Sequence, residues 1–319
     1  MTECDYTMCI LQPVTHWNMN KRIPAITQHP QGVRRRVPGG FAATLSQKQV
    51  AAFLKPRPCD SHKGLFGTVV VIGGASGMVG APLLAARAAL KMGAGCVHVG
   101  LLADNAPVVD LVQPELMLHS ASDALRLHNV DVLAVGCGMG ISAAAQKILY
   151  EALKTDAALV LDADALNLLA RHSDLQDDLR ARKATAVITP HPGEAARLLG
   201  ISTKQVQAGR AVVAQQLAEK LHCTVVLKGA DSVCVTRDGK TYINKTGNPG
   251  MSAPGMGDVL TGMIAAFIAQ GLNADQALLL AVHLHGAAGD TLAEKGIAVG
   301  MTATDVAEWA RWLLNQWVC

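Results

Sequence analysis

From Leu45 onward the chain alternates short apolar runs, rich in β-branched residues, with longer runs of helical periodicity. Each apolar run ends in a polar or glycine-rich turn before the next helical run begins. This alternation is typical of a mostly parallel sheet whose strands are joined by helices. It predicts an α/β fold of three layers, with a mostly parallel central sheet and helices on both faces.

The same pattern gives approximate bounds for the elements. Strands are predicted at residues 68–72, 96–100, 132–135, 159–161, 186–188, 224–227, 233–235 and 241–243, the last two forming a hairpin with a glycine turn. Helices are predicted at residues 81–92 and 143–153, and the C-terminal part of the chain is predicted to be helical. Ser202 and Gln205 form a capping-box pattern that predicts one long helix up to about Leu221.

The chain is predicted to hold one domain, residues 45–319, preceded by an extension at residues 1–44. The extension mixes Pro, Gln, Asn, Cys and Arg without periodicity and lacks the apolar core of a signal peptide. Its run Arg34-Arg35-Arg36 is interpreted as a solvated arm rather than a phosphate site. The longest apolar stretches, such as Val259 to Ala269, fall short of the roughly 18 residues that span a bilayer.

Composition narrows the class of protein. Half of the residues are apolar but only 3% are aromatic, so the core is expected to consist of aliphatic side chains. A net charge of +3 without clustered Lys and Arg argues against nucleic acid as a partner. The eight cysteines show no CxxC pair and no metal-ligand spacing, which indicates reduced thiols in a cytoplasmic protein.

Glycine turns follow several of the predicted strands, where parallel sheets bind their ligands. The turn Gly73 to Gly77 only loosely resembles a dinucleotide fingerprint, and a simple strand-to-helix turn is the preferred interpretation. The segment Asn248 to Gly262 is more informative. Gly255, Met256 and Gly257 precede an apolar helix that begins near Asp258, so their N–H groups are predicted to form an anion hole.

Asp258 itself has two interpretations. A carboxylate at the start of a helix stabilises that helix as a cap. A carboxylate beside an anion hole is also what phosphoryl transfer to an alcohol requires, because the hydroxyl must lose its proton to a base. The catalytic interpretation is favoured.

The chain here resembles the ribokinase-like superfamily. Gly255-Met256-Gly257-Asp258 is similar to its GxGD signature, and residues 248–262 resemble the corresponding block of the NAD(P)H-hydrate dehydratases. Further segments agree in order and spacing: His62-Lys63-Gly64, Val71 to Gly74, Asp162 to Leu169, Thr189 to Glu194, Val226 to Ala230 and Leu284 to Asp290. The resemblance covers roughly residues 45–314, and its motifs are specific jointly rather than singly.

The resemblance implies a ribokinase-like fold and roles for individual residues. Asp258 would be the base for the hydroxyl of the hydrated nicotinamide ring. The substrate would also contact Ala81, Gly138 and His191. The adenine nucleotide would be bound by Lys228, Gly229, Ala230, Asp231, Ser232 and Gly257. Taken alone, Lys228 also fits a surface lysine at a strand end.

The resemblance also implies Mg²⁺, organised by Glu194 through water. His191 and Glu194 equally fit a helix cap, and Asp162 and Asp164 fit either Mg²⁺ positioning or capping of the next helix. His191 stands where related kinases carry Asn, which supports a dehydratase. Pro254, Met256 and Cys137 depart from the residues usual in the family.

The implied reaction is ADP-dependent dehydration of the S epimer of hydrated NADH or NADPH, with ATP as the alternative donor. A cytoplasmic homo-oligomer, such as a tetramer, is expected. The epimerase domain often fused ahead of such dehydratases is absent, so a separate epimerase would act with it. Two alternatives remain: a ribokinase-like kinase for a hydroxymethyl or hydroxyethyl heterocycle, and a nucleotide-binding sensor without turnover.

Overall fold

The computed structural model describes residues 36–37 and 40–318. The described residues all belong to one compact unit. Ala43 and Thr44, which fall inside the predicted extension, form strand β3. Most of the predicted extension, including Arg34 and Arg35 of the basic run, lies outside the described residues.

A ten-stranded sheet forms the centre of the described part of the chain. From one edge to the other its strands are β3 (Ala43–Thr44), β12 (Thr241–Asn244), β11 (Ser232–Val235), β10 (Thr224–Leu227), β9 (Ala186–Ile188), β8 (Ala158–Leu161), β7 (Val132–Val135), β4 (Thr68–Gly73), β5 (Cys96–Leu101) and β6 (Met117–Ser120). The run from β10 to β6 is parallel throughout. Only β11 runs antiparallel to its neighbours, and β1 (Arg36–Val37) and β2 (Gly40–Phe41) pair separately.

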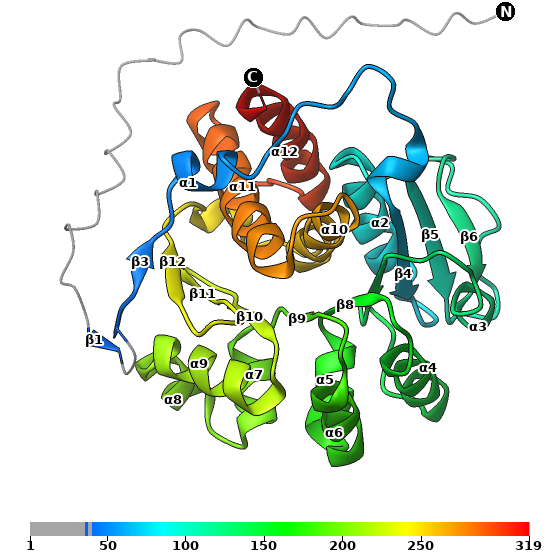
Figure 1. Cartoon of the computed structure of the whole chain (residues 1–319), viewed down its shortest axis with the longest axis horizontal. Coiled ribbons are helices and arrows are strands. Elements are labelled where there is room, and N and C mark those ends of the chain that lie inside the picture. The colour runs from blue at the N-terminus through cyan, green and yellow to red at the C-terminus, as the bar shows by residue number, and fades with distance from the viewer. Residues whose placement is uncertain (1–35, 38–39, 319) are drawn as a thin grey trace, which may run out of the picture. The chain divides into compact units, whose positions relative to one another are not determined.

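Helices cover both faces of the sheet (Figure 1). One face carries α1 (Gln47–Ala51), α2 (Gly80–Lys91), α10 (Met256–Ala269), α11 (Ala274–Glu294) and α12 (Ala303–Trp317). The other carries α3 (Ala121–Ala124), α4 (Ala143–Leu153), α5 (Asp164–Arg171), α6 (Ser173–Ala181), α7 (Pro192–Leu199), α8 (Thr203–Ala208) and α9 (Arg210–Leu221). Two 3₁₀ turns, η1 (Lys63–Phe66) and η2 (Pro249–Met251), lie in the connections.

Two apolar cores result, one on each face of the sheet. In β4 the side chains of Val69 and Val71 pack into the core under α2, α10 and α11, whereas Val70 and Ile72 pack into the core with α3, α4 and α5. This division follows from the two-residue period of a strand. Because both faces are covered, the strands are continuously apolar, which is the pattern that predicted a parallel sheet.

The α/β three-layer prediction is confirmed, and two details of it need correction. The single helix predicted from Ser202 to Leu221 is two helices, because the backbone at Gly209 leaves the helical region (φ −139°, ψ 44°). Glycine weakens a helix interior and permits such a break. Strand β6 was not predicted, since its short sequence Met117 to Ser120 is half polar and lies at the sheet edge.

The strand order places a topological switch point between β4 and β7. From β4 the chain adds β5 and β6 on one side, then returns to add β7 on the other. In open parallel sheets, ligands bind beyond the carboxyl ends of the strands at such a point. No helix of the described residues is both long and apolar enough to cross a membrane. The cysteines at 59, 96, 137, 223 and 234 form no disulfide.

Candidate active site

Polar side chains from successive strands meet at one edge of the sheet. Asp162 follows β8, His191 follows β9 and Lys228 follows β10, and the three strands are parallel neighbours. The backbone N–H of Lys228 donates to the carbonyl of Pro190 at 2.8 Å, which ties the ends of β9 and β10 together. The strand register therefore gathers residues that are far apart in the sequence.

A buried ion pair lies at the centre of this edge. Lys228 Nζ donates to Asp162 Oδ1 at 2.6 Å. Thr261 of α10 donates its hydroxyl to Asp162 Oδ2 at 2.9 Å, and the N–H of Ala163 donates to Oδ1 at 2.8 Å. Burial acts to raise the pKa of Asp162, but the charge and hydrogen bond of Lys228, together with the hydrogen bonds from Thr261 and Ala163, lower the pKa on balance. Lys228 is correspondingly held as a cation.

The N-terminus of α10 points toward this pair. Gly255 caps the helix with a left-handed backbone (φ 85°), and Met256, Gly257 and Asp258 form its first turn. The first N–H groups of a helix have no acceptor within it and carry its positive dipole. A Cβ at Gly257 would lie 3.1 Å from Lys228 Nζ and 3.4 Å from Asp162 Oδ2, so Gly257 directly adjoins the ion pair. The N–H groups of the predicted anion hole and the ammonium of Lys228 therefore lie next to each other at the same edge of the sheet.

Asp258 sits in the first turn of α10 without acting as its cap. No side chain makes a cap hydrogen bond at this helix end, where Gly255 occupies the cap position. The carboxylate instead accepts a hydrogen bond from the thiol of Cys137, in the turn after β7. The pKa of Asp258 is raised to about 6, chiefly by burial and to a smaller extent by the charge of Asp162, while the Cys137 hydrogen bond and Lys228 act in the opposite direction. A carboxylate with this pKa is both ionised and basic near neutral pH.

His191 and Glu194 form the predicted helix cap at the start of α7. Glu194 Oε2 accepts from the His191 N–H at 2.7 Å, and His191 Nδ1 accepts from the Gly193 N–H at 2.9 Å. Since Nδ1 accepts, the neutral ring carries its proton on Nε2, which lies 3.2 Å from Glu194 Oε1. Burial raises the pKa of Glu194 to about 7, an effect that nearby Lys228 opposes and Asp162 reinforces. The pKa of His191 is lowered by burial, then by Lys228 and Arg197.

The turns after β4 and β7 are hydrogen-bonded to each other and form a second wall of the candidate site, beside the ends of β8, β9 and β10. The N–H of Gly74 donates to the Cys137 carbonyl at 3.0 Å, and that of Ala75 donates to the Gly138 carbonyl at 2.7 Å. Gly138 has a positive φ of 57°, and a Cβ there would lie 3.2 Å from Ala81 Cβ. Two predicted substrate residues, Ala81 and Gly138, are therefore neighbours at the switch point.

Asp164 has a role in holding this wall. Its Oδ2 accepts from the N–H of Gly140 at 2.8 Å, and its Oδ1 accepts from Asn167 at 3.1 Å. Asp164 thus ties the turn after β7 to the start of α5. The sequence left both Asp162 and Asp164 as candidates for Mg²⁺ positioning or helix capping. In the structure Asp162 pairs with Lys228, and Asp164 holds the backbone of the turn at Gly140.

The predicted nucleotide residues 228–232 form a tight loop between β10 and β11. Gly229 has φ 135° and Asp231 has φ 54°, and Ser232 Oγ donates to the Gly229 carbonyl at 2.8 Å. Asp231 pairs with Lys245 at 2.6 Å on the exposed side. Sequence reasoning did not single out Thr261, although it lies in the same block as Asp258, nor Arg210, which contacts this loop from α9.

Asp162 and Glu194 could contact Mg²⁺ through water, but they do not form a complete set of ligands for it. No cluster of three or more His, Cys, Asp or Glu residues suited to a metal occurs in the described part of the chain. Both oxygens of Asp162 and of Glu194 already accept hydrogen bonds or contact His191. This donor set suits an ion held mainly by phosphate oxygens and water, as Mg²⁺ commonly is.

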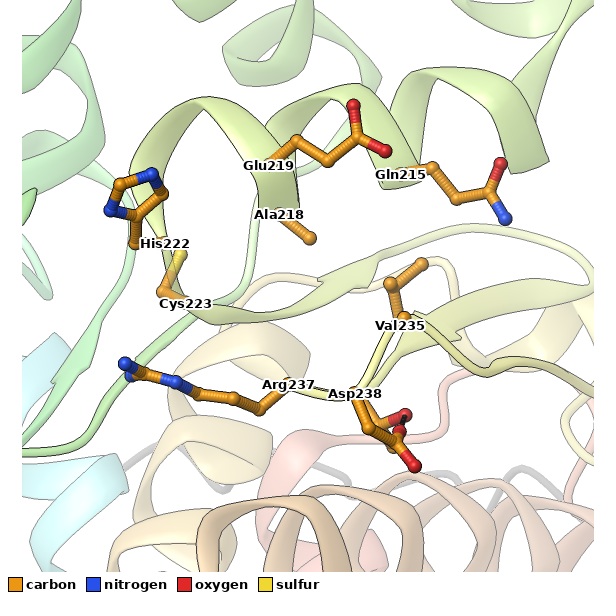
Figure 2. A pocket seen from close by; sticks show the side chains of 10 residues that line it. Gln215, Ala218, Glu219, His222, Cys223, Val235, Arg237 and Asp238 are labelled. Atoms are coloured by element: carbon orange, nitrogen blue, oxygen red, sulfur yellow. Dashed lines mark hydrogen bonds between the residues drawn. The ribbon is translucent and has the colours of Figure 1, made fainter. Parts of the chain in front are cut away.

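A separate cavity of about 560 Å³ lies away from this edge (Figure 2). Gln215 and Glu219 of α9, with His222 directly after that helix, line one side, and Arg237 and Asp238 of the hairpin turn line the other. Val235 pairs with Val225 at the amino-terminal end of β10, whereas Lys228 follows the carboxyl end. The cavity is therefore at the opposite edge of the sheet from the candidate site.

An open, mostly parallel sheet whose carboxyl edge brings together the N-terminus of α10, a carboxylate and a buried lysine is the architecture of a ribokinase-like α/β enzyme. The comparisons with known proteins agree. The family model described as NAD(P)H-hydrate dehydratase matches residues 69–311. This chain belongs to the NAD(P)H-hydrate dehydratase family.

Individual relatives support the assignment. The chain is 42% identical over 266 residues to the ADP-dependent (S)-NAD(P)H-hydrate dehydratase of Neisseria meningitidis, covering 82% of this chain and 90% of the relative. It is also 42% identical to the bifunctional NAD(P)H-hydrate repair enzyme of Coxiella burnetii, but spans only 55% of that protein.

A solved structure shows the same fold. The ADP/ATP-dependent NAD(P)H-hydrate dehydratase of Bacillus subtilis, co-crystallised with ATP and Mg²⁺, superposes with a TM-score of 0.77 at 28% identity. The match covers 86% of this chain and 99% of that one.

Proposed function

We propose that the protein catalyses ADP-dependent dehydration of the S epimer of hydrated NADH and NADPH, releasing AMP and phosphate. It is a hydro-lyase, and the 42% identity to the Neisseria dehydratase over most of both chains supports this activity. The observation that carries the mechanism is the position of Asp258, whose pKa is raised to about 6, beside the N–H groups of α10 and the Lys228–Asp162 pair.

In the proposed reaction Asp258 accepts the proton of the ring hydroxyl while the hydroxyl oxygen attacks the β-phosphorus of ADP. The bond from this phosphorus to the AMP oxygen breaks. The N–H groups of Met256 and Gly257 hold the phosphoryl oxygens in place. The bond from the ring carbon to the oxygen of the new phosphate ester then breaks, and phosphate leaves with the electron pair as the ring nitrogen donates electrons. Transfer of a proton from the adjacent ring carbon to water restores the dihydronicotinamide.

Lys228 is placed to balance phosphate charge. Its ammonium is positioned by Asp162, which in turn is held by Thr261. Residues 229–232 would carry the rest of the nucleotide. Mg²⁺, when bound, would neutralise phosphate charge, with Glu194 reaching it through water.

The substrate is assigned to the wall at the switch point. A Cβ at Gly138 would lie 2.8 Å from Met78 Cβ and 3.2 Å from Ala81 Cβ, so this glycine lets the turn after β7 pack closely against the segment that opens α2. The ring would bind beside this junction, next to the small side chain of Ala81. His191, half exposed and neutral, would donate from Nε2 to the substrate or to Glu194. ADP is the preferred donor, and ATP is the alternative named for the Bacillus protein.

The assembly and partners are part of the same proposal. We propose that the protein forms a homo-oligomer, and family resemblance suggests a tetramer. We also propose a functional link to an NAD(P)H-hydrate epimerase. The bifunctional relatives, of which this chain spans about half, support that link.

The test is a single incubation of the protein with hydrated NADH, ADP and Mg²⁺. Absorbance of NADH should appear in step with AMP and phosphate, and removal of nucleotide should abolish it. A stable phosphorylated alcohol without recovery of NADH would instead assign a kinase. Binding of ADP without any product would leave a nucleotide sensor.

A further inference from the structure

Arg210, the first residue of α9, contacts the loop proposed to bind the nucleotide. Its Nη2 donates to the carbonyl of Leu227 at 3.0 Å and to that of Lys228 at 3.3 Å. Its Nη1 donates to Gln207 at 3.3 Å. The guanidinium therefore holds the two carbonyls at which β10 ends and the loop begins.

The loop needs such support because its backbone leaves ordinary conformations. Gly229 at φ 135° and Asp231 at φ 54° follow directly on the last residues of β10. A Cβ at position 229 would lie 3.1 Å from Arg210 Nη1 and 3.3 Å from Nη2. The guanidinium thus occupies the space beside Gly229, and the glycine and the arginine fit each other.

The charge of Arg210 has no ion-pair partner in the described part of the chain. Asp231 acts on it only through the longer-range electrostatic field, and Arg210 Nε is buried without a hydrogen-bond partner among the described residues. A partly buried cation without a carboxylate contact is unfavourable for folding alone. Its position behind a loop that would carry phosphate charge offers a reason for it.

We propose that Arg210 is a positioning residue for nucleotide binding, acting through the Leu227 and Lys228 carbonyls to hold residues 228–232 in the binding conformation. The inference rests on the proposed function, in which this loop binds ADP. Arg210 would also help to position the Lys228–Asp162 pair, because the Lys228 carbonyl is one of the two groups to which Arg210 donates.

Arg182 offers a matched control. Its Nη1 donates to the carbonyl of Thr155 at 2.8 Å, its guanidinium also contacts the Leu153 and Ala157 carbonyls, and its Nε is buried without a described partner. These carbonyls lie in the connection from α4 to β8, at the amino-terminal edge of the sheet. Arg182 therefore binds backbone as Arg210 does, but far along the strands from the site.

The experiment compares ADP affinity by calorimetry in the wild type and in Arg210→Ala, Arg210→Lys and Arg182→Ala, with melting temperatures measured alongside. Both alanine variants should melt at lower temperature. Arg210→Ala should bind ADP at least tenfold more weakly, while Arg182→Ala stays within twofold of the wild type. Millimolar guanidinium should restore part of the affinity of Arg210→Ala.

Arg210→Lys is the variant that decides if Arg210→Ala does not fold. Its ammonium reaches one carbonyl without the planar fork, so we expect a three- to tenfold loss of ADP affinity in a folded protein. Unchanged ADP affinity in the folded Arg210 variants, or an equal loss in Arg182→Ala, would overturn the inference. Failure of the wild type to bind ADP would overturn the proposed function and this inference together.

Discussion

Lys228 Nζ lies 2.6 Å from Asp162 Oδ1, and the two residues come from the ends of strands separated in the sheet by β9. The pair is nearly closed to solvent, with 2% of the Asp162 side chain and 20% of the Lys228 side chain exposed. It joins the predicted nucleotide loop to a carboxylate that the sequence assigned to either metal or cap.

Lys228→Ala should affect both stability and nucleotide binding, and a second substitution separates the effects. Removing the lysine leaves Asp162 buried without its cation, which we expect to destabilise the fold by about 3–5 kcal/mol. Lys228→Ala with Asp162→Asn should recover most of that loss in urea unfolding, yet still bind ADP weakly. Recovery of ADP affinity in the double variant would show that Lys228 acts only on the fold.

Asp258→Asn should abolish most turnover while leaving nucleotide binding intact. The amide retains the shape of the carboxylate but cannot accept the hydroxyl proton, so kcat should fall by roughly 10²–10⁴-fold. The measurement is NADH recovery from its hydrate, with ADP binding followed by calorimetry. A folded variant with near-normal turnover would remove Asp258 from the mechanism.

The activity should fall on the acid side with the titration of Asp258. Its pKa is raised to about 6 by burial, and the ionised form is the base, so kcat/KM should decline as pH drops through about 6. The thiol of Cys137 stabilises the carboxylate by a hydrogen bond and so lowers this pKa. Cys137→Ala should move the acid limb to higher pH. If the acid limb of Cys137→Ala stays at the same pH or moves to lower pH, Cys137 does not lower the pKa of Asp258.

The raised pKa of Asp258 also affects stability, because the ionised form that serves as the base is the form that destabilises the fold. The folded protein binds the Asp258 proton more tightly than the unfolded chain, whose pKa is near 3.8. Ionisation of Asp258 therefore destabilises the fold, and the penalty develops as pH rises from about 4 through about 6. Asp258→Asn lacks the penalty, so relative to the wild type it should gain on the order of 1–3 kcal/mol between pH 4 and pH 8. Urea unfolding at both pH values measures the gain.

Glu194→Gln should raise the Mg²⁺ requirement. If the carboxylate orders water around the ion, its loss should increase the half-saturating Mg²⁺ concentration roughly tenfold. Glu219→Gln, on the exposed face of α9 at the opposite edge, provides the control and should change nothing. An identical Mg²⁺ titration in Glu194→Gln would confine Glu194 to capping α7 and holding His191.

The sequence by itself determined the fold class and the residues that the parallel sheet presents. Continuous apolar strands ending in polar or glycine turns require both faces of the sheet to be covered, so the three layers followed from the pattern. It also predicted that Gly255 to Asp258 open a helix, because the apolar run that follows them is longer than an ordinary strand.

Tertiary structure alone decided which of these groups touch. Thr261 and Lys228 meet Asp162 because parallel strand ends converge with the N-terminus of α10, and Asp258 meets Cys137 across the switch point. Such contacts depend on strand order and helix placement, which local patterns do not specify. The break at Gly209 was also beyond the pattern, since a glycine within a helical run is tolerated or breaks the helix according to its packing.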